Sequence, residues 1–172
     1  MNDGQKRSTS SRPGVKNNPL EFRSEKLIRT PNRAKEGVIV EMTSLTETAR
    51  KMLEGKNFVY LATVNPDGTP QVTPTWVDTD GKFVLVNTAI GRVKHRNVKK
   101  NPHVALAITD QNNPYDLVVI RGKVVEQLTG RVAEEHIDKM SKKYRGIDKY
   151  PNRSPGEQRV ILKIEPTRII SR

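Results

Sequence analysis

The chain has 172 residues, a formal net charge of +12 and no cysteine. This length suits one domain with room for a short appendage. The lack of cysteine excludes disulfide bonds, thiolate catalysis and zinc–thiolate sites. No stretch has the length and apolarity of a signal peptide or a membrane span, so we expect a cytoplasmic protein with no membrane partner.

The positive charge is spread over the chain. Residues 1–42 hold nine basic and five acidic side chains, which leaves a net charge of +8 on residues 43–172. Residues 1–42 contain too few apolar side chains to offset the entropy of ordering, and they predict a flexible basic extension. Alternatively, residues 38–40 could pair as a short strand and cover a partner's ligand. The charge of the domain predicts an anionic partner: nucleic acid, lipid or a phosphorylated small molecule.

The first half of the domain predicts a capped helix followed by a meander. Ser44 and Glu47 have the spacing of a capping box, and Gly55 is placed to end the helix. Apolar, β-branched runs separated by turn residues then predict three strands, 57–64, 69–77 and 82–87, with turns at 65–68 and 78–81.

The second half predicts a short basic helix over 91–100, three more strands and an amphipathic helix over 130–144. The strands are expected at 103–109, 115–126 and 160–164, with a bulge at Gly122. Six antiparallel strands with few helices predict a mainly β protein, a small barrel with peripheral helices. Residues 145–157 are interpreted as a flexible rim loop.

Residues 87–97 are the strongest candidate for a binding site. A strand ends in Asn87 and Thr88, passes Gly91 and enters a helix whose first turn holds Arg92 and Lys94. The free N–H groups of a helix start, together with two cations, suit a phosphate. A solvated basic helix face is an equally good interpretation.

A second candidate is the strand containing Pro70 and Pro74, which cannot donate to a full ladder and therefore belongs at a sheet edge. Trp76, the only tryptophan, could form a wall for a flat ring or could be a core residue. The three histidines lack metal-ligand spacing, so no metal site is expected. Neither a GxGxxG nor a P-loop pattern occurs.

The order of these motifs resembles a known family. A Phe58–Val64 strand, the Asn65–Pro70 turn, Val72–Trp76, the 87–97 segment and Asn101–Leu106 occur in sequence. This order, followed by Arg121-Gly122-Lys123-Val124, resembles the pyridoxamine 5′-phosphate oxidase-like superfamily. The resemblance covers about residues 44–171 and implies an antiparallel FMN-binding split barrel. It is strongest to the class of oxidoreductases that use the deazaflavin coenzyme F420.

The resemblance also implies site residues and a homodimer with cofactor sites at the subunit interface. Thr88, Arg92 and Lys94 match the residues that hold the cofactor phosphate, with Asn87 and Asn97 beside them. The segment lying along the cofactor ring corresponds to Val72, Thr73, Pro74, Thr75 and Trp76. The strand expected to reach the partner's cofactor contributes Tyr115, Asp116 and Arg121. No catalytic side chain is implied.

Three functions follow from these observations. The first is hydride transfer between reduced F420 and an unsaturated small molecule, with the cofactor supplying the chemistry. The second keeps the fold and assigns FMN, in an oxidase, a reductase or a flavin-binding protein. The third is a haem- or nucleic-acid-binding module. The C-terminal Trp and Arg elements of true pyridoxamine phosphate oxidases are missing, since the chain ends in Ile169-Ile170-Ser171-Arg172, which argues against vitamin B6 oxidation.

Overall fold

The computed structural model describes Met1, residues 44–113 and residues 115–171. The predicted extension, residues 1–42, lies outside the described residues apart from Met1, and so does the possible strand at 38–40. The described helices are α1 (Glu47–Glu54), α2 (Val93–Lys100) and α3 (Arg131–Arg145). The described strands are β1 (Val59–Val64), β2 (Pro70–Thr75), β3 (Asp78–Thr79), β4 (Val84–Ala89), β5 (His103–Thr109), β6 (Leu117–Thr129) and β7 (Arg159–Ser171).

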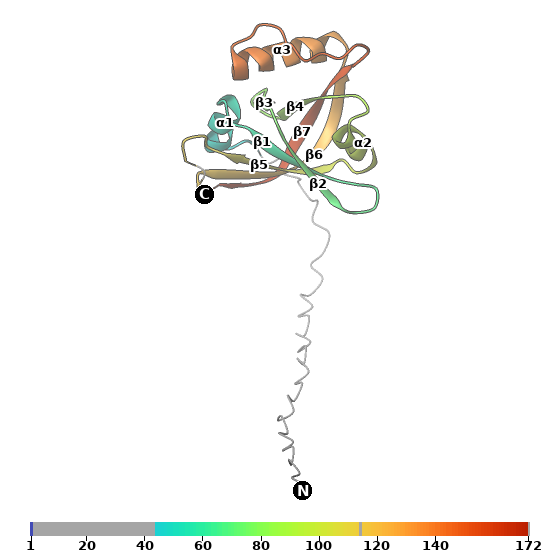
Figure 1. Cartoon of the computed structure of the whole chain (residues 1–172). Coiled ribbons are helices and arrows are strands. Elements are labelled where there is room, and N and C mark those ends of the chain that lie inside the picture. Colours follow the sequence, from blue (N-terminus) through green and yellow to red (C-terminus); the bar gives the residue numbers. More distant parts are fainter. Residues whose placement is uncertain (2–43, 114, 172) are drawn as a thin grey trace, which may run out of the picture. The chain divides into compact units, whose positions relative to one another are not determined.

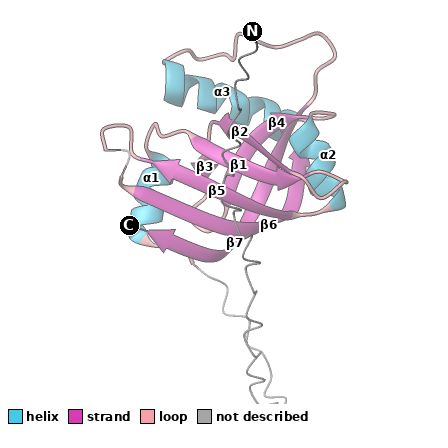
Figure 2. Cartoon of the chain, turned by 60° about the horizontal axis from the view of Figure 1, so that its bottom comes forward, coloured by secondary structure: helices cyan, strands magenta, loops and turns pink. Residues whose placement is uncertain are grey.

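All strands of the described part form one antiparallel sheet in the order β2-β1-β5-β6-β7-β4-β3, which curls on itself (Figure 1). Figure 2 shows β1, β5, β6 and β7 side by side across this sheet. The strand with Pro70 and Pro74 lies at one edge, which confirms the prediction made from its prolines.

The structure has seven strands where the sequence predicts six. The additional strand is β3, whose Asp78 and Thr79 pair with Leu85 and Val84. These two residues are predicted as part of a turn. The turn begins later because the Asp80 carboxylate accepts the N–H groups of residues 82 and 83, at 3.0 and 2.7 Å.

The N-terminal cap of α1 also differs from the prediction. Thr46, not Ser44, is the cap: its backbone is extended (φ −63°, ψ 157°), and its Oγ1 accepts the N–H of Ala49 at 3.2 Å. Gly55 ends the helix as predicted, its N–H donating to the carbonyl of Lys51 at 3.0 Å. The helix then presents Ala49, Met52 and Leu53 to the core.

Strands β6 and β7 are longer than predicted and bend together. The pairing register shifts between Arg121 and Gly122, which confirms the predicted bulge, and again between Val124 and Glu126. A Cβ at residue 122 would lie 2.6 Å from Ile164 Cγ2, so only glycine lets the two strands approach here. β7 continues past Pro166 to Ser171, well beyond the predicted end at 164.

The core lies on the inner face of the curled sheet. Alternate residues of each strand face it, and their side chains are almost fully buried: Val59, Leu61, Val84, Val86, Leu106, Ile108, Val118, Ile120, Leu162 and Ile164. α1 packs on this core. α3 packs against β7, β6 and β4, and α2 packs against β1 (Figure 1). In the described part of the chain, no helix is long and apolar enough to cross a membrane.

Candidate functional site

The turn between β4 and α2 presents the start of a helix to solvent. Gly91 has a φ of +85°, and the N–H of Arg92 donates to the carbonyl of Ala89 at 3.3 Å, which closes the turn. Arg92 is the N-cap of α2, and no side chain in the described part of the chain caps the helix. The first N–H groups of α2 therefore have no capping acceptor, which is the arrangement that binds anions.

The two cations of this turn differ in their surroundings. The guanidinium of Arg92 is half exposed, and its Nη2 lies 2.9 Å from Oε2 of Glu157. Lys94 is partly buried, and the structure gives it no carboxylate partner among the described residues. Burial, and then the charge of Arg92, lower the pKa of the Lys94 ammonium group. A bound anion would offset both effects and raise this pKa, because it would place an opposite charge beside the ammonium group.

Two buried hydroxyls lie on the inner face of the sheet, one in β4 and one in the edge strand β2. Oγ1 of Thr88 and Oγ1 of Thr73 are inaccessible and have no hydrogen-bond partner within residues 44–113 and 115–171. Thr88 alternates with Asn87 in β4 and so faces the same side as Val86, while Thr73 pairs with Leu61. Buried polar groups are normally paired, so an unpaired hydroxyl marks a place where a ligand or a water completes the structure. Thr88, Lys94 and the start of α2 thus fit a phosphate group.

Asn97 connects α2 to β1. Its side chain is almost fully buried, and its amide nitrogen donates to Oγ1 of Thr63 at 3.0 Å and to Oδ1 of Asn65 at 2.8 Å. The predicted neighbour of the phosphate therefore anchors the helix that carries Lys94. Its amide hydrogens are already used within the protein.

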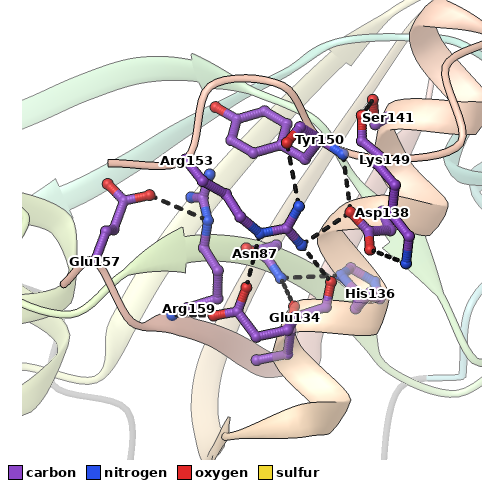
Figure 3. A network of polar contacts seen from close by, with 11 residues as sticks. Asn87, Glu134, His136, Asp138, Ser141, Lys149, Tyr150, Arg153, Glu157 and Arg159 are labelled. Atoms are coloured by element: carbon purple, nitrogen blue, oxygen red, sulfur yellow. Dashed lines mark hydrogen bonds and ion pairs between the residues drawn. The ribbon is translucent and has the colours of Figure 1, made fainter. Parts of the chain in front are cut away.

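Asn87 lies on the other side of β4 and contacts α3. Its amide nitrogen donates to the carbonyl of Ala133 at 2.8 Å and lies 3.4 Å from Nδ1 of His136 (Figure 3). The structure does not bring Asn87 together with Thr88, because consecutive residues of a strand point to opposite faces.

The predicted ring-binding strand is divided in the same way. In β2, Thr73 and Thr75 pair with the buried residues Leu61 and Val59, whereas Val72 and Pro74 face outward. Trp76 follows the strand. It is only partly buried, and its ring packs against two tyrosine rings. Its ring stacks on that of Tyr144, with centroids 5.3 Å apart and an angle of 8°, and lies edge-on to that of Tyr150 at 5.9 Å.

The residues expected to reach a partner lie on other elements, in the loop between β5 and β6 and in β6 itself. Tyr115 is 89% exposed, and Asp116 is exposed in the same loop. Arg121 is on the outer face of the sheet, opposite to the face of Thr73, and its Cα pairs with that of Arg168. It lines an outward-facing pocket of about 350 Å³ with Ala62, Thr63, Val64, Pro70, His103, Val104, Ala105, Gly122 and Thr167.

Sequence reasoning missed the polar network beside the turn (Figure 3). Arg159 is 3% exposed, its guanidinium lies 4.6 Å from the ring centre of Tyr150, and its Nε lies 3.3 Å from Glu157 Oε1. The sequence predicts a flexible rim loop around Tyr150. In the structure this loop is attached to α3, because Asp138 accepts the N–H of Tyr150 at 2.8 Å and pairs with Lys149 at 3.0 Å. The basic and aromatic composition of 145–157 was the only available signal.

These features define a curled antiparallel half-barrel, the fold class of flavin- and deazaflavin-type oxidoreductases, with a turn whose uncapped helix start and two cations suit an anion. The family model for pyridoxamine 5′-phosphate oxidase matches residues 45–172. The chain belongs to this pyridoxamine 5′-phosphate oxidase-like split-barrel family. The resemblance inferred from the motif order is thereby confirmed.

Solved structures agree with this assignment. An F420 reductase is 33% identical, with a TM-score of 0.62 over 70% of this chain and 94% of that protein. A putative pyridoxamine 5′-phosphate oxidase from Listeria innocua is 23% identical, with a TM-score of 0.52 over 70% and 92% of the two chains. A conserved hypothetical protein from Mycobacterium tuberculosis is 20% identical, with a TM-score of 0.56 over 76% and 86%. No curated protein matches the chain.

Proposed function

We propose that the protein binds the phosphate of coenzyme F420 at the β4–α2 turn and is an F420-dependent oxidoreductase acting on an unsaturated small molecule. The observation that carries the proposal is the buried Oγ1 of Thr88, unpaired among the described residues, in the strand that leads into the uncapped start of α2. Similarity to an F420 reductase, at 33% identity, supports F420. The net charge of +12 favours a polyanionic cofactor.

In this proposal the phosphate accepts hydrogen bonds from Thr88, from the first N–H groups of α2 and from Lys94. Arg92 adds a charged donor when it turns from Glu157 toward the ligand. The bound cofactor supplies hydride transfer. The protein's own contribution is to hold the ring along β2, where Thr73 Oγ1 and the neighbouring backbone can orient it.

FMN is the alternative cofactor, because a phosphate at the turn is common to both ligands and the matched family model is that of pyridoxamine 5′-phosphate oxidase. Titration of the purified protein with F420 and with FMN, followed by ligand fluorescence, separates the two. We expect submicromolar to micromolar binding of F420 and at least tenfold weaker binding of FMN. The reverse order would assign the protein to the FMN-dependent members.

The turn itself is tested by the double variant R92A/K94A, which we expect to weaken F420 binding by about 100-fold or more, since charged hydrogen bonds contribute about 1.5–3 kcal/mol each. The matched control is K99A/K100A, which removes two positive charges from the last turn of the same helix. We expect less than a threefold effect there. Equal losses in both variants would mean that net charge, and not the turn, attracts the cofactor.

We further propose that two copies associate through the outer face of the sheet. This face exposes apolar side chains that a monomer would normally cover: Tyr60 is 47% exposed, Val72 56% and Ile170 39%. The same face also carries small residues that allow close approach, Ala62 and Ala105, in the pocket lined by Arg121. The proposal places Arg121 where a partner subunit's ligand could reach it.

Light scattering after size-exclusion chromatography tests this association. V72E places a charge on the proposed interface and should convert a dimer to a monomer. V132E is the matched control, because Val132 of α3 is similarly exposed, at 47%. A monomeric wild-type protein, or a V72E variant that stays dimeric, would exclude this interface.

A further inference from the structure

Two side chains of α2 hold the glycine of the anion-binding turn. The N–H of Gly91 donates to Nδ1 of His95 at 3.0 Å, and a guanidinium nitrogen of Arg96 donates to the carbonyl of Gly91. Both polar groups of this peptide segment are therefore held by the helix that follows it. Gly91 has a φ of +85°. Glycine can adopt positive and negative φ values about equally well, so these two bonds select one of several accessible backbone conformations.

The bond to His95 requires a neutral imidazole. A ring nitrogen that accepts an N–H cannot carry a proton, so the hydrogen-bond pattern assigns the proton of His95 to Nε2. His95 as a whole is 4% exposed. Burial, followed by the positive charges of Lys99 and Arg96, lowers the pKa of His95 and favours this neutral form.

No acidic group offsets those charges on the strand packed against α2. Between Val59 and Val64, β1 contains one titratable side chain, Tyr60, and it faces outward. Beyond the turn, Glu157 is already paired with Arg92. Protonation of His95 would therefore add a fifth positive charge to α2, which already carries Lys94, Arg96, Lys99 and Lys100, and would direct an N–H at the N–H of Gly91.

We propose that His95 is a positioning residue that holds the β4–α2 turn in its anion-binding form only while its imidazole is neutral, so that phosphate binding weakens on acidification. This inference rests on the proposed function. Its sign is opposite to that of simple electrostatics, in which an added positive charge beside the site would strengthen anion binding. The reason is that two donors cannot share one hydrogen bond, and breaking it releases Gly91 and the start of α2.

The test is the affinity for F420 between pH 5 and 8 in wild type, H95N and H95L. The Oδ1 atom of asparagine can occupy the place of Nδ1 and accept the same N–H, but it does not titrate. We expect wild-type affinity to fall by up to tenfold per pH unit below the pKa of His95, because binding is linked to the loss of one proton. H95N should keep the neutral-pH affinity and lose this dependence, and H95L should bind weakly at every pH.

Any titration of the ligand or of other groups appears in wild type and H95N alike, so the difference between their profiles isolates His95. Parallel profiles, or affinity that rises on acidification in wild type alone, would overturn the inference. If wild type binds neither F420 nor FMN, the proposed function fails, and the structural part is still tested without ligand. NMR should then show the amide signal of Gly91 moving as His95 titrates in the full chain. If the chemical shift of the Gly91 amide does not change as His95 titrates, the inference is overturned, whichever cofactor the protein binds.

Discussion

Arg92 Nη2 lies 2.9 Å from Glu157 Oε2, although the two residues are 65 positions apart in the sequence. The other oxygen of the same carboxylate lies 3.3 Å from Nε of Arg159, which is buried. One carboxylate thus connects an exposed cation at the candidate site with a cation inside the protein. Glu157 therefore competes with the proposed ligand for Arg92, while it stabilises the fold by pairing with the buried Arg159.

The substitution E157Q should separate these demands. Arg92 loses its competing carboxylate, so we expect F420 to bind about three- to tenfold more tightly. Arg159 loses its charged partner while buried, so the free energy of unfolding should fall by about 1–3 kcal/mol. Titration and urea denaturation measure the two effects. E135Q is the control, because Glu135 pairs with the exposed Arg131 at 3.5 Å, and its loss should cost less than about 0.5 kcal/mol. Unchanged stability of E157Q would contradict this role.

Asp78 should make stability depend on pH. Burial alone would raise the pKa of its carboxyl group, but contacts with His136, with Lys139 at 2.5 Å and with a backbone N–H outweigh burial and hold the pKa well below 3.8. A depressed pKa contributes stability that is present above the unfolded-state pKa and is lost as the pH falls through the folded-state value. We therefore expect the free energy of unfolding to decrease steadily below about pH 4.

The variant D78N tests this assignment by urea denaturation between pH 2 and 7. It should be less stable than wild type by about 2–4 kcal/mol at pH 7, and its stability should change less between pH 4 and pH 2. D148N is the control, since Asp148 pairs with Lys142 at the surface, where both side chains are more than 70% exposed. Identical pH slopes in D78N and wild type would assign the acid dependence to other groups.

The sequence predicted those parts of the fold that neighbouring residues determine, such as strand ends and bulges. The strand at 103–109 has the predicted ends because Asn101-Pro102 blocks its start and a polar loop follows it. The bulge at Gly122 follows from a glycine inside an apolar run. The two-residue β3 was missed because Asp-Thr-Asp-Gly is turn chemistry and only pairing with β4 makes its first half a strand.

The site was less accessible to sequence reasoning because its parts meet only in the folded chain. No acidic residue occurs between Asp80 and Asp110, so the sequence near Arg92 shows no partner for it, whereas the fold brings Glu157 to it. Asn87 was grouped with Thr88, although the alternation of strand side chains directs its amide to α3. His95 has no motif around it. Only the contact with Gly91 identifies its role.

Tyr144 links α3 to the residues that precede β1 and follow β2. Its hydroxyl donates to the carbonyl of Asn57 at 2.7 Å and accepts the N–H of Val77 at 3.1 Å. Y144F keeps the ring beside Trp76 and removes both bonds, so the free energy of unfolding should fall by about 1–3 kcal/mol. Because Trp76 is the only tryptophan, its fluorescence should be unchanged in Y144F and altered in Y144A. Wild-type stability in Y144F would mean that stacking alone holds α3.

Gly122 is the position where we expect a single methyl group to cost most. In G122A the new Cβ would lie 2.6 Å from Ile164 Cγ2 and 2.7 Å from the carbonyl oxygen of Glu165, and the backbone oxygen cannot move without disturbing the β6–β7 pairing. Thermal and urea denaturation should show a loss of about 2–4 kcal/mol. G68A is the informative comparison: residue 68 has a φ of +86° and open space around it, so only backbone strain of about 1 kcal/mol is expected. If G122A is no less stable than G68A, the two long strands can separate freely at the bulge, and close approach is not what requires glycine there.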